Sequence, residues 1–122
     1  MRTKRAGHAC FADEATSSIF VVGGYDDQRN RLSSTEKWTF GQSSWQSSAN
    51  MPEAISASSA VHSNGKNYVG YLAGGEIGIK DSKDIFGLRR RDMTWIKMNK
   101  TMEKGRLWHS LLNIPVNQVL GC

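Results

Sequence analysis

The sequence is poor in several kinds of residue, and each shortage excludes a class of protein. Its 122 residues include only 2 Pro and 2 Cys. No apolar run approaches the roughly 18 residues of a transmembrane helix, so no membrane span is predicted. Cys10 and Cys122 form neither a C-x-x-C nor a C-x-x-H pair, which argues against zinc, and two cysteines are too few for a disulfide scaffold. We therefore expect a reduced, cytoplasmic setting, or an extracellular one if a signal peptide is missing from this chain.

Residues that carry catalysis are also scarce. The histidines are His8, His62 and His109, and no two of them stand at i, i+2 or i, i+4 spacing. No carboxylate accompanies them at the spacing of metal ligands, and no G-x-S-x-G motif is present. We expect no catalytic residue, no metal and no cofactor, and we expect that the chain is not an enzyme.

The charge is basic but scattered. The chain has 16 Lys and Arg against 11 Asp and Glu, and this surplus favours an acidic partner or nucleic acid. Its one concentrated run, Arg89-Arg90-Arg91, is followed at once by Asp92. The run is either a solvated turn or a contact for a small anion or phosphate, because three guanidiniums cannot all pair with one carboxylate. No aromatic residues interleave with the run, so nucleic-acid binding is not predicted.

An internal repeat of about fifty residues is the strongest positive feature. An apolar run ending in two glycines occupies residues 21–24, and a second occupies residues 72–75, fifty-one positions later. A lone tryptophan follows each run at nearly the same distance, first Trp45 and then Trp95. A glycine pair after an apolar run allows positive φ angles and a close approach to a neighbouring strand. The repeated glycines are Gly23, Gly24, Gly74 and Gly75.

Further positions follow the same period. Arg5 and His8 precede the first glycine pair, and Arg106 and His109 would open a third unit. The middle unit departs from this pattern, with isoleucine and serine at the two positions. Because His8 and His109 share a repeat position, we expect them in equivalent places, each with a structural hydrogen bond.

This combination of period, glycine pair and tryptophan resembles the kelch repeat. The resemblance covers residues 1 to about 112 and implies an all-β fold of kelch-type β-propeller blades, each a four-stranded antiparallel sheet. Strands are expected near residues 7–12, 19–23, 35–40 and 45–48, and near 58–63, 68–73, 85–88 and 95–98. The first blade would span about 5–50, the second about 55–101 and a partial third about 106–122.

Two blades are fewer than a closed propeller needs. Propellers usually have about four to eight blades, because each blade covers an apolar face of the next. We therefore expect an incomplete propeller that can self-associate through exposed blade faces, and we expect Trp45 and Trp95 to pack between blades. The strand at 68–73 is longer than its counterpart, which predicts a bulge at Gly70 unless the coding sequence contains an error.

The resemblance implies a protein–protein interaction module. In kelch proteins the loops between the second and third strands, here 25–32 and 76–84, and those between blades, here 50–53 and 99–105, form the partner-binding face. The partner-binding residues expected are Tyr25, Arg29, Arg31 and Lys80. Relatives include substrate-recognition parts of ubiquitin ligase adaptors and actin-associated or other cytoskeletal proteins. The alternative is a fragment of a propeller enzyme, an oxidase or a sugar mutarotase.

Overall fold

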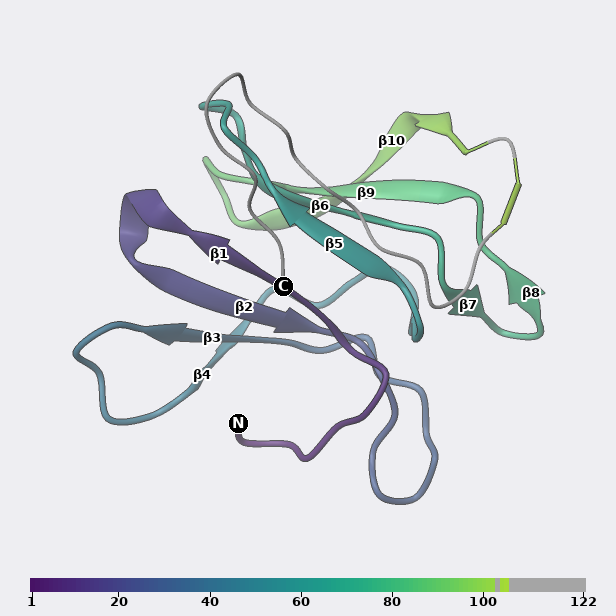
Figure 1. Ribbon diagram of the computed structural model, residues 1–122, viewed down its shortest axis with the longest axis horizontal. Helices are drawn as coiled ribbons and strands as arrows, with labels where there is room; N and C mark the ends of the chain where they lie inside the picture. Colours follow the sequence, from purple (N-terminus) through teal and green to yellow (C-terminus); the bar gives the residue numbers. More distant parts are fainter. Residues whose placement is uncertain (103, 106–122) are drawn as a thin grey trace.

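Two four-stranded antiparallel sheets make up most of the protein (Figure 1). The computed structural model describes residues 1–102, 104 and 105. The first sheet contains β1 (Ala9–Asp13), β2 (Ser18–Val22), β3 (Thr35–Thr39) and β4 (Gln46–Ser48), hydrogen-bonded in that order. The second sheet contains β5 (Ser59–His62), β6 (Tyr68–Ala73), β9 (Asp84–Arg89) and β10 (Thr94–Thr101), also in chain order. A short 3₁₀ helix, η1 (Glu14–Thr16), lies between β1 and β2, and a small hairpin, β7 (Glu76–Ile77) and β8 (Lys80–Asp81), lies between β6 and β9.

The strands of both sheets confirm the strands predicted from the repeat. Their bounds agree closely, and the largest difference is at the end of β10, expected near residue 98 and observed at Thr101. The predicted bulge is also present, because the register of β6 on β9 shifts between Tyr68 and Gly70. The β7–β8 hairpin was not predicted, since strands of two residues are too short to show an alternating pattern.

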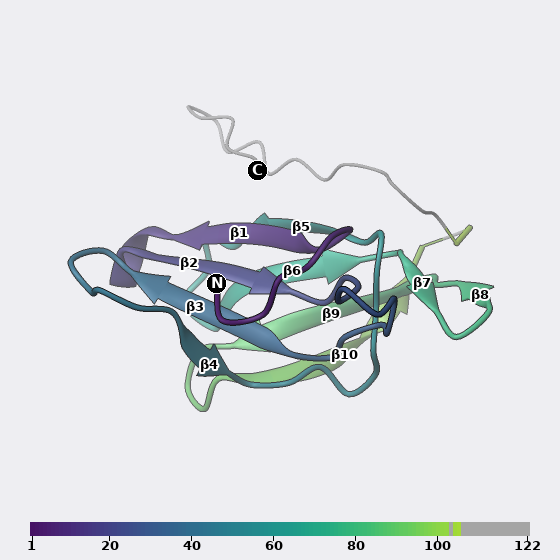
Figure 2. The ribbon, with the colours of Figure 1, turned by 90° about the horizontal axis from the view of Figure 1, so that it is seen from below.

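The two sheets lie face to face, and β1 of the first contacts β5 and β6 of the second (Figure 2). Because side chains alternate between the faces of a strand, one face of each sheet supplies the apolar interior between them. Phe11 of β1 is central to this interior: its ring stacks on Phe20 at 5.1 Å and meets Trp95 edge-on at 6.2 Å. The other buried members are Ala9, Val22, Met51, Ile55, Ala60, Val69, Leu72, Phe86 and Leu88.

The bulge at Gly70 makes room for the aromatic interior. A Cβ atom at this position would lie 2.6 Å from Cδ2 of Phe11 and 2.9 Å from the carbonyl oxygen of Val61. No side chain can be accommodated at such distances without displacing the Phe11 ring. Gly70 therefore absorbs the extra length of β6 and also lets the first sheet approach the second.

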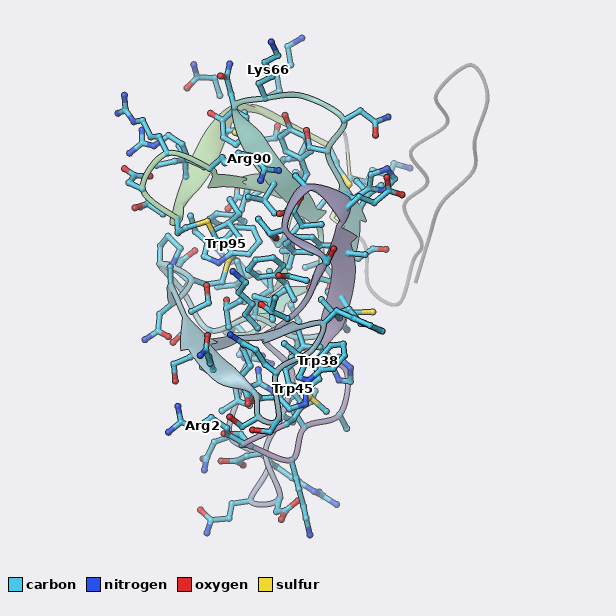
Figure 3. The ribbon with its side chains drawn as sticks, turned by 90° about the vertical axis from the view of Figure 1, so that its left-hand side faces the viewer. Arg2, Trp38, Trp45, Lys66, Arg90 and Trp95 are labelled. Carbon is cyan, nitrogen blue, oxygen red and sulfur yellow. The ribbon has the colours of Figure 1, made fainter. Side chains whose placement is uncertain are left out.

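The two repeated tryptophans occupy different environments, which corrects the expectation that both are interior. Trp95 is only 3% exposed, and its indole Nε1–H donates a hydrogen bond of 3.1 Å to the Thr35 hydroxyl on the first sheet. Trp45 is half-buried and is not among the buried cluster. Figure 3 shows Trp95 between the sheets, with Trp38 and Trp45 together and farther from the second sheet. Trp45 is not enclosed because, among the described residues, the first sheet has a neighbouring sheet on one face only.

The glycine pairs have the positive φ angles that the sequence predicted, but the backbone that they approach belongs to the segments before β1 and β5 and not to a neighbouring strand. Gly24 has a φ of +93° and Gly75 a φ of +88°. A Cβ atom at Gly24 would lie 2.5 Å from the carbonyl oxygen of Ala6, and one at Gly75 would lie 2.6 Å from that of Ser56. Any side chain at either position would therefore clash with backbone.

Backbone hydrogen bonds repeat with the sequence period. The bridge between Ala6 and Tyr25 in the first unit has a counterpart between Ser56 and Glu76 in the second. Two methionines at the repeat boundary form equivalent backbone hydrogen bonds. The N–H of Met51 donates to Ser33 at 2.7 Å, and the N–H of Met102 donates to Lys83 at 2.8 Å. The repeat read from the sequence is thus a repeat of backbone geometry.

Candidate functional site

The long loops of both sheets lie at one end of the molecule, which we call the loop end. It consists of loop 23–34 between β2 and β3, loop 74–83 with the β7–β8 hairpin, and linker 49–58 between β4 and β5. Figure 2 shows the β7–β8 hairpin at this end and the β3–β4 turn at the other. The four residues expected to bind a partner, Tyr25, Arg29, Arg31 and Lys80, all belong to the loop end.

Arg31 ties the two sheets together at the loop end. Its Nε–H donates to the Ser56 hydroxyl at 3.0 Å, and Nη1 donates to the carbonyl oxygen of Gly78 at 2.9 Å. Its Nη2 forms an ion pair with Glu76 at 3.1 Å. The guanidinium also lies over the Tyr25 ring, 5.5 Å from its centre, and the Tyr25 hydroxyl donates to Glu76. Most of the polar groups of Arg31 and Tyr25 are therefore used in contacts within the chain. These contacts fix one loop against the other.

Arg29 is at the tip of a loop with an ordered base. Asp26 accepts hydrogen bonds from the backbone N–H groups of Asn30, at 2.8 Å, and Gln28, at 2.9 Å, and from the Asn30 side chain. Because these donors stabilise the carboxylate, the pKa of Asp26 is held below its ordinary value, chiefly by the Asn30 backbone. Arg29 has a φ of +64° and an exposed side chain. The base of the loop is fixed while its cation faces solvent.

The β7–β8 hairpin presents the second exposed tip. Lys80 is exposed at the start of β8, and Ile79 beside it is 96% exposed. Among the large apolar residues that are exposed in the described part of the chain, none is more exposed than Ile79. Ile79 was not singled out from the sequence, although a glycine followed by one other residue is typical of a two-residue hairpin turn. Ile79 and Lys80 together offer an apolar contact next to a positive charge.

Arg5, a repeat residue, is buried at the join between the first segment and the first glycine pair. Its side chain is fully buried, and Nη1 donates to the carbonyl oxygens of Gly23 and Ser34, each at 3.0 Å. Its Nη2 pairs with Glu36 at 2.6 Å. Burial acts to raise the pKa of Glu36, but hydrogen bonds from the Arg2 backbone and the Arg5 side chain outweigh it and leave the pKa lowered. This cluster joins the first segment to the first sheet, and it borders a hollow of about 290 Å³ whose lining also includes Arg2, Ser47 and Asn50.

His8 lies beside this cluster and is half-buried. Burial and the positive charge of Arg5 lower its pKa, while a hydrogen bond to the Arg5 backbone acts in the opposite direction. Its Nδ1 atom is buried without a hydrogen-bond partner among the described residues. In the second unit the Arg5 position is taken by Ile55, which is fully buried in the core. Arg106 and His109 lie outside the described residues.

The arginine run lies at the other end of the molecule, which we call the hairpin end. Arg90 reaches across to the first sheet, where its Nη1 and Nη2 donate to both carboxylate oxygens of Asp13 at 3.1 and 2.9 Å. Asp13 is 5% exposed; burial alone would raise its pKa, but the hydrogen bonds from Arg90 and Thr16 lower it overall. Arg89 pairs with Asp92 through two bonds of 3.0 and 2.6 Å. No sequence pattern indicates the Asp13 contact, which spans 77 residues.

No group of three or more His, Cys, Asp and Glu side chains is placed to hold a metal ion in the described part of the chain. Within the same residues, no helix is long and apolar enough to cross a membrane. Cys10, on β1, is half-buried and is not a free thiol.

Two stacked four-stranded antiparallel sheets, joined by linker 49–58, have the arrangement of neighbouring β-propeller blades. The described residues form no closed propeller. Comparison with known families gives the more specific class: the family model described as the kelch motif matches residues 16–52, which include β2, β3 and β4. The chain therefore carries a kelch motif, its two sheets are consistent with kelch blades, and kelch modules usually bind proteins. No curated protein matches the chain.

Proposed function

We propose that the chain is a binding module, not an enzyme, and that a partner protein docks on the loop end of the two blades. The observation that carries this proposal is the set of contacts from Arg31 to Ser56, Gly78 and Glu76. These contacts join both long loops and the linker, so the loop end is one connected surface. A preformed surface loses little conformational entropy when a partner binds.

The exposed tips supply the groups that a partner would contact. The Arg29 and Lys80 side chains carry positive charge and form no hydrogen bond or ion pair among the described residues, and Ile79 adds an apolar side chain. Charges at the edge of an interface mainly raise the rate of association with an oppositely charged partner. The partner face is therefore acidic, with an apolar spot that covers Ile79. Tyr25 and Arg31 connect the two loops that carry these tips.

The kelch resemblance implies two more specific roles, and the loop end would be the binding surface in both. In an adaptor of a ubiquitin ligase the loop end would select the substrate, and in a cytoskeletal protein it would hold actin or an actin-associated protein. Both roles use docking without chemistry on the bound protein. The identity of the captured partner distinguishes them.

A test compares two charge-reversed variants of equal formal charge. The loop-end variant carries Arg29→Glu and Lys80→Glu, and the control carries Lys66→Glu and Arg91→Glu at the hairpin end. Partners are captured from lysate on immobilised protein, identified by mass spectrometry and then measured as purified proteins. We expect the loop-end variant to lose a partner that the control retains, with unchanged circular dichroism in both.

The loss should shrink at high salt, where the Debye length falls to about 3 Å at 1 M. Equal retention by both variants would contradict a docking role for the loop end. The enzyme alternative makes a different prediction: the wild-type chain would bind a metal in stoichiometric amount or turn over an alcohol or sugar, and the histidines would be required.

A further inference from the structure

A second charged surface lies at the hairpin end, opposite the loops proposed above. It is a hollow of about 520 Å³ between the β5–β6 connection and the β9–β10 turn. Its lining residues are Lys66, Asn67, Tyr68, Arg89, Arg90 and Arg91. Four of these six side chains are cations, and Figure 3 shows Lys66 and Arg90 at the same side of the second sheet.

Hydrogen bonds hold the walls of the hollow in place. The backbone N–H of Arg90 donates to the carbonyl oxygen of Asn67 at 2.8 Å and so joins its two walls. Arg90 is anchored to Asp13 and Arg89 to Asp92, each through two hydrogen bonds. These pairs hold the two guanidiniums in place. Each guanidinium has five N–H donors and uses two in its pair, so both can still donate to a ligand.

Two further cations remain uncompensated. Lys66 and Arg91 are exposed and form no hydrogen bond or ion pair among the described residues. The charge of Arg91 does act through space on Asp92, where it helps to lower the pKa of that carboxyl. Four cations thus face two carboxylates, which leaves an excess of positive charge around an open volume.

The arrangement of these cations indicates the shape of the ligand. Arg89 and Arg90 are neighbours at the end of β9, and successive side chains of a strand leave on opposite sides. One is indeed held by Asp92 on its own turn and the other by Asp13 on the first sheet. Lys66 lies on a separate connection. Cations spread in this way suit several anionic groups along an extended chain better than one compact anion.

We propose that the hairpin end binds an acidic peptide segment, with Lys66 and Arg91 contacting its carboxylates and Arg89 and Arg90 lining the groove beneath. Single-stranded nucleic acid would need bases stacked on aromatic rings. The one ring in the lining, Tyr68, already packs on Tyr71 at 5.4 Å. This binding site is separate from the loop end, and its failure would leave the proposed function intact.

The test measures binding of a fluorescent oligoglutamate peptide to the full chain by anisotropy, with oligoglutamine as the uncharged control peptide. We expect Lys66→Glu with Arg91→Glu to weaken binding about five- to thirtyfold, since two exposed attractions become repulsions. Lys4→Glu with Lys100→Glu removes the same charge at two exposed positions away from the hairpin end and should change the affinity by less than about twofold.

Further arms separate the alternatives. If charge reversal disturbs folding, Lys66→Gln with Arg91→Gln removes the charges without adding carboxylates near Asp13 and Asp92, and should still weaken binding severalfold. Equal weakening by both charge-reversed variants would show only a long-range effect of net charge and would overturn the proposal. Full displacement of the peptide by millimolar inorganic phosphate, or tighter binding of oligothymidine through the same residues, would also overturn it.

Discussion

Replacement of Trp95 tests whether this side chain holds the two blades together. Trp95 is 3% exposed, and its ring contacts Phe11 of the first blade edge-on. Removing such a buried ring in Trp95→Ala should lower the free energy of unfolding by about 3–5 kcal/mol. It would also leave the buried Thr35 hydroxyl without its indole donor. Because small domains are stabilised by only about 5–15 kcal/mol, this is a large share of the total.

The indole hydrogen bond can be separated from the packing by a double-mutant cycle. Trp95→Phe keeps an aromatic ring but removes the N–H donor, and Thr35→Val removes the acceptor while keeping the shape of the side chain. If the two groups interact as the structure shows, their coupling free energy should be about 0.5–1.5 kcal/mol. Urea denaturation followed by circular dichroism gives the unfolding free energy of each variant.

Trp45 supplies the matched control, because it occupies the same repeat position on the first blade. It is half-buried, so Trp45→Ala should cost about 1.5–2.5 kcal/mol, roughly half the loss expected for the buried Trp95 ring. Equal losses for Trp45→Ala and Trp95→Ala would refute the reasoning, since the environments differ in the structure. A coupling free energy near zero in the Trp95–Thr35 cycle would refute the hydrogen bond between blades.

Three other predictions concern packing, pH and association. Gly70→Ala should destabilise the chain by about 1–3 kcal/mol, since its Cβ would lie 2.6 Å from the Phe11 ring, whereas Gly65→Ala meets only an ordinary contact at 3.4 Å and should be near neutral in the same urea assay. The lowered pKa of His8 means that the unfolded chain binds more protons, so stability should fall as pH drops below 6.5, and His8→Gln should reduce this slope in urea titrations. Phe40 is 77% exposed, so the wild-type chain should self-associate in size-exclusion chromatography with light scattering, and Phe40→Ser should weaken this; a monodisperse 13.6 kDa wild type would contradict it.

The strands were predictable because the internal repeat and the kelch resemblance place them at equivalent positions in both units. The glycine pairs end β2 and β6 at equivalent points. The bulge at Gly70 followed from comparing the lengths of these two strands. The packing of Phe11 on that glycine did not follow, because it joins residues 59 positions apart on different sheets.

The environment of a repeated residue was less predictable than its backbone. Trp45 and Trp95 share one sequence position, yet burial depends on which sheet lies beside each ring. The contacts of the loop residues also depend on which segments the fold brings beside them. Arg31 was expected to contact a partner, but Glu76 and Ser56 lie close enough to use its guanidinium internally. No spacing rule relates residue 31 to residues 56 and 76, so only the folded chain shows this.

Departures from the repeat distinguish the two blades at the hairpin end. The N–H of Phe40 donates to Ser17 at 2.9 Å, and in the second blade the N–H of Arg90 donates to Asn67 at 2.8 Å, so Phe40 and Arg90 hold equivalent backbone positions. Phe40 lines an apolar hollow of about 390 Å³ on the first blade, whereas Arg90 lines the basic one on the second.

Asp13 lines the apolar hollow and also pairs with Arg90, so one carboxylate connects the two surfaces. The backbone pattern is shared while the side chains differ. Binding specificity in this chain should therefore reside where the blades differ and not in the glycines and tryptophans that define the repeat. Exchanging exposed hairpin side chains such as those of Lys66 and Arg91 should alter what binds while leaving the contacts between the sheets unchanged.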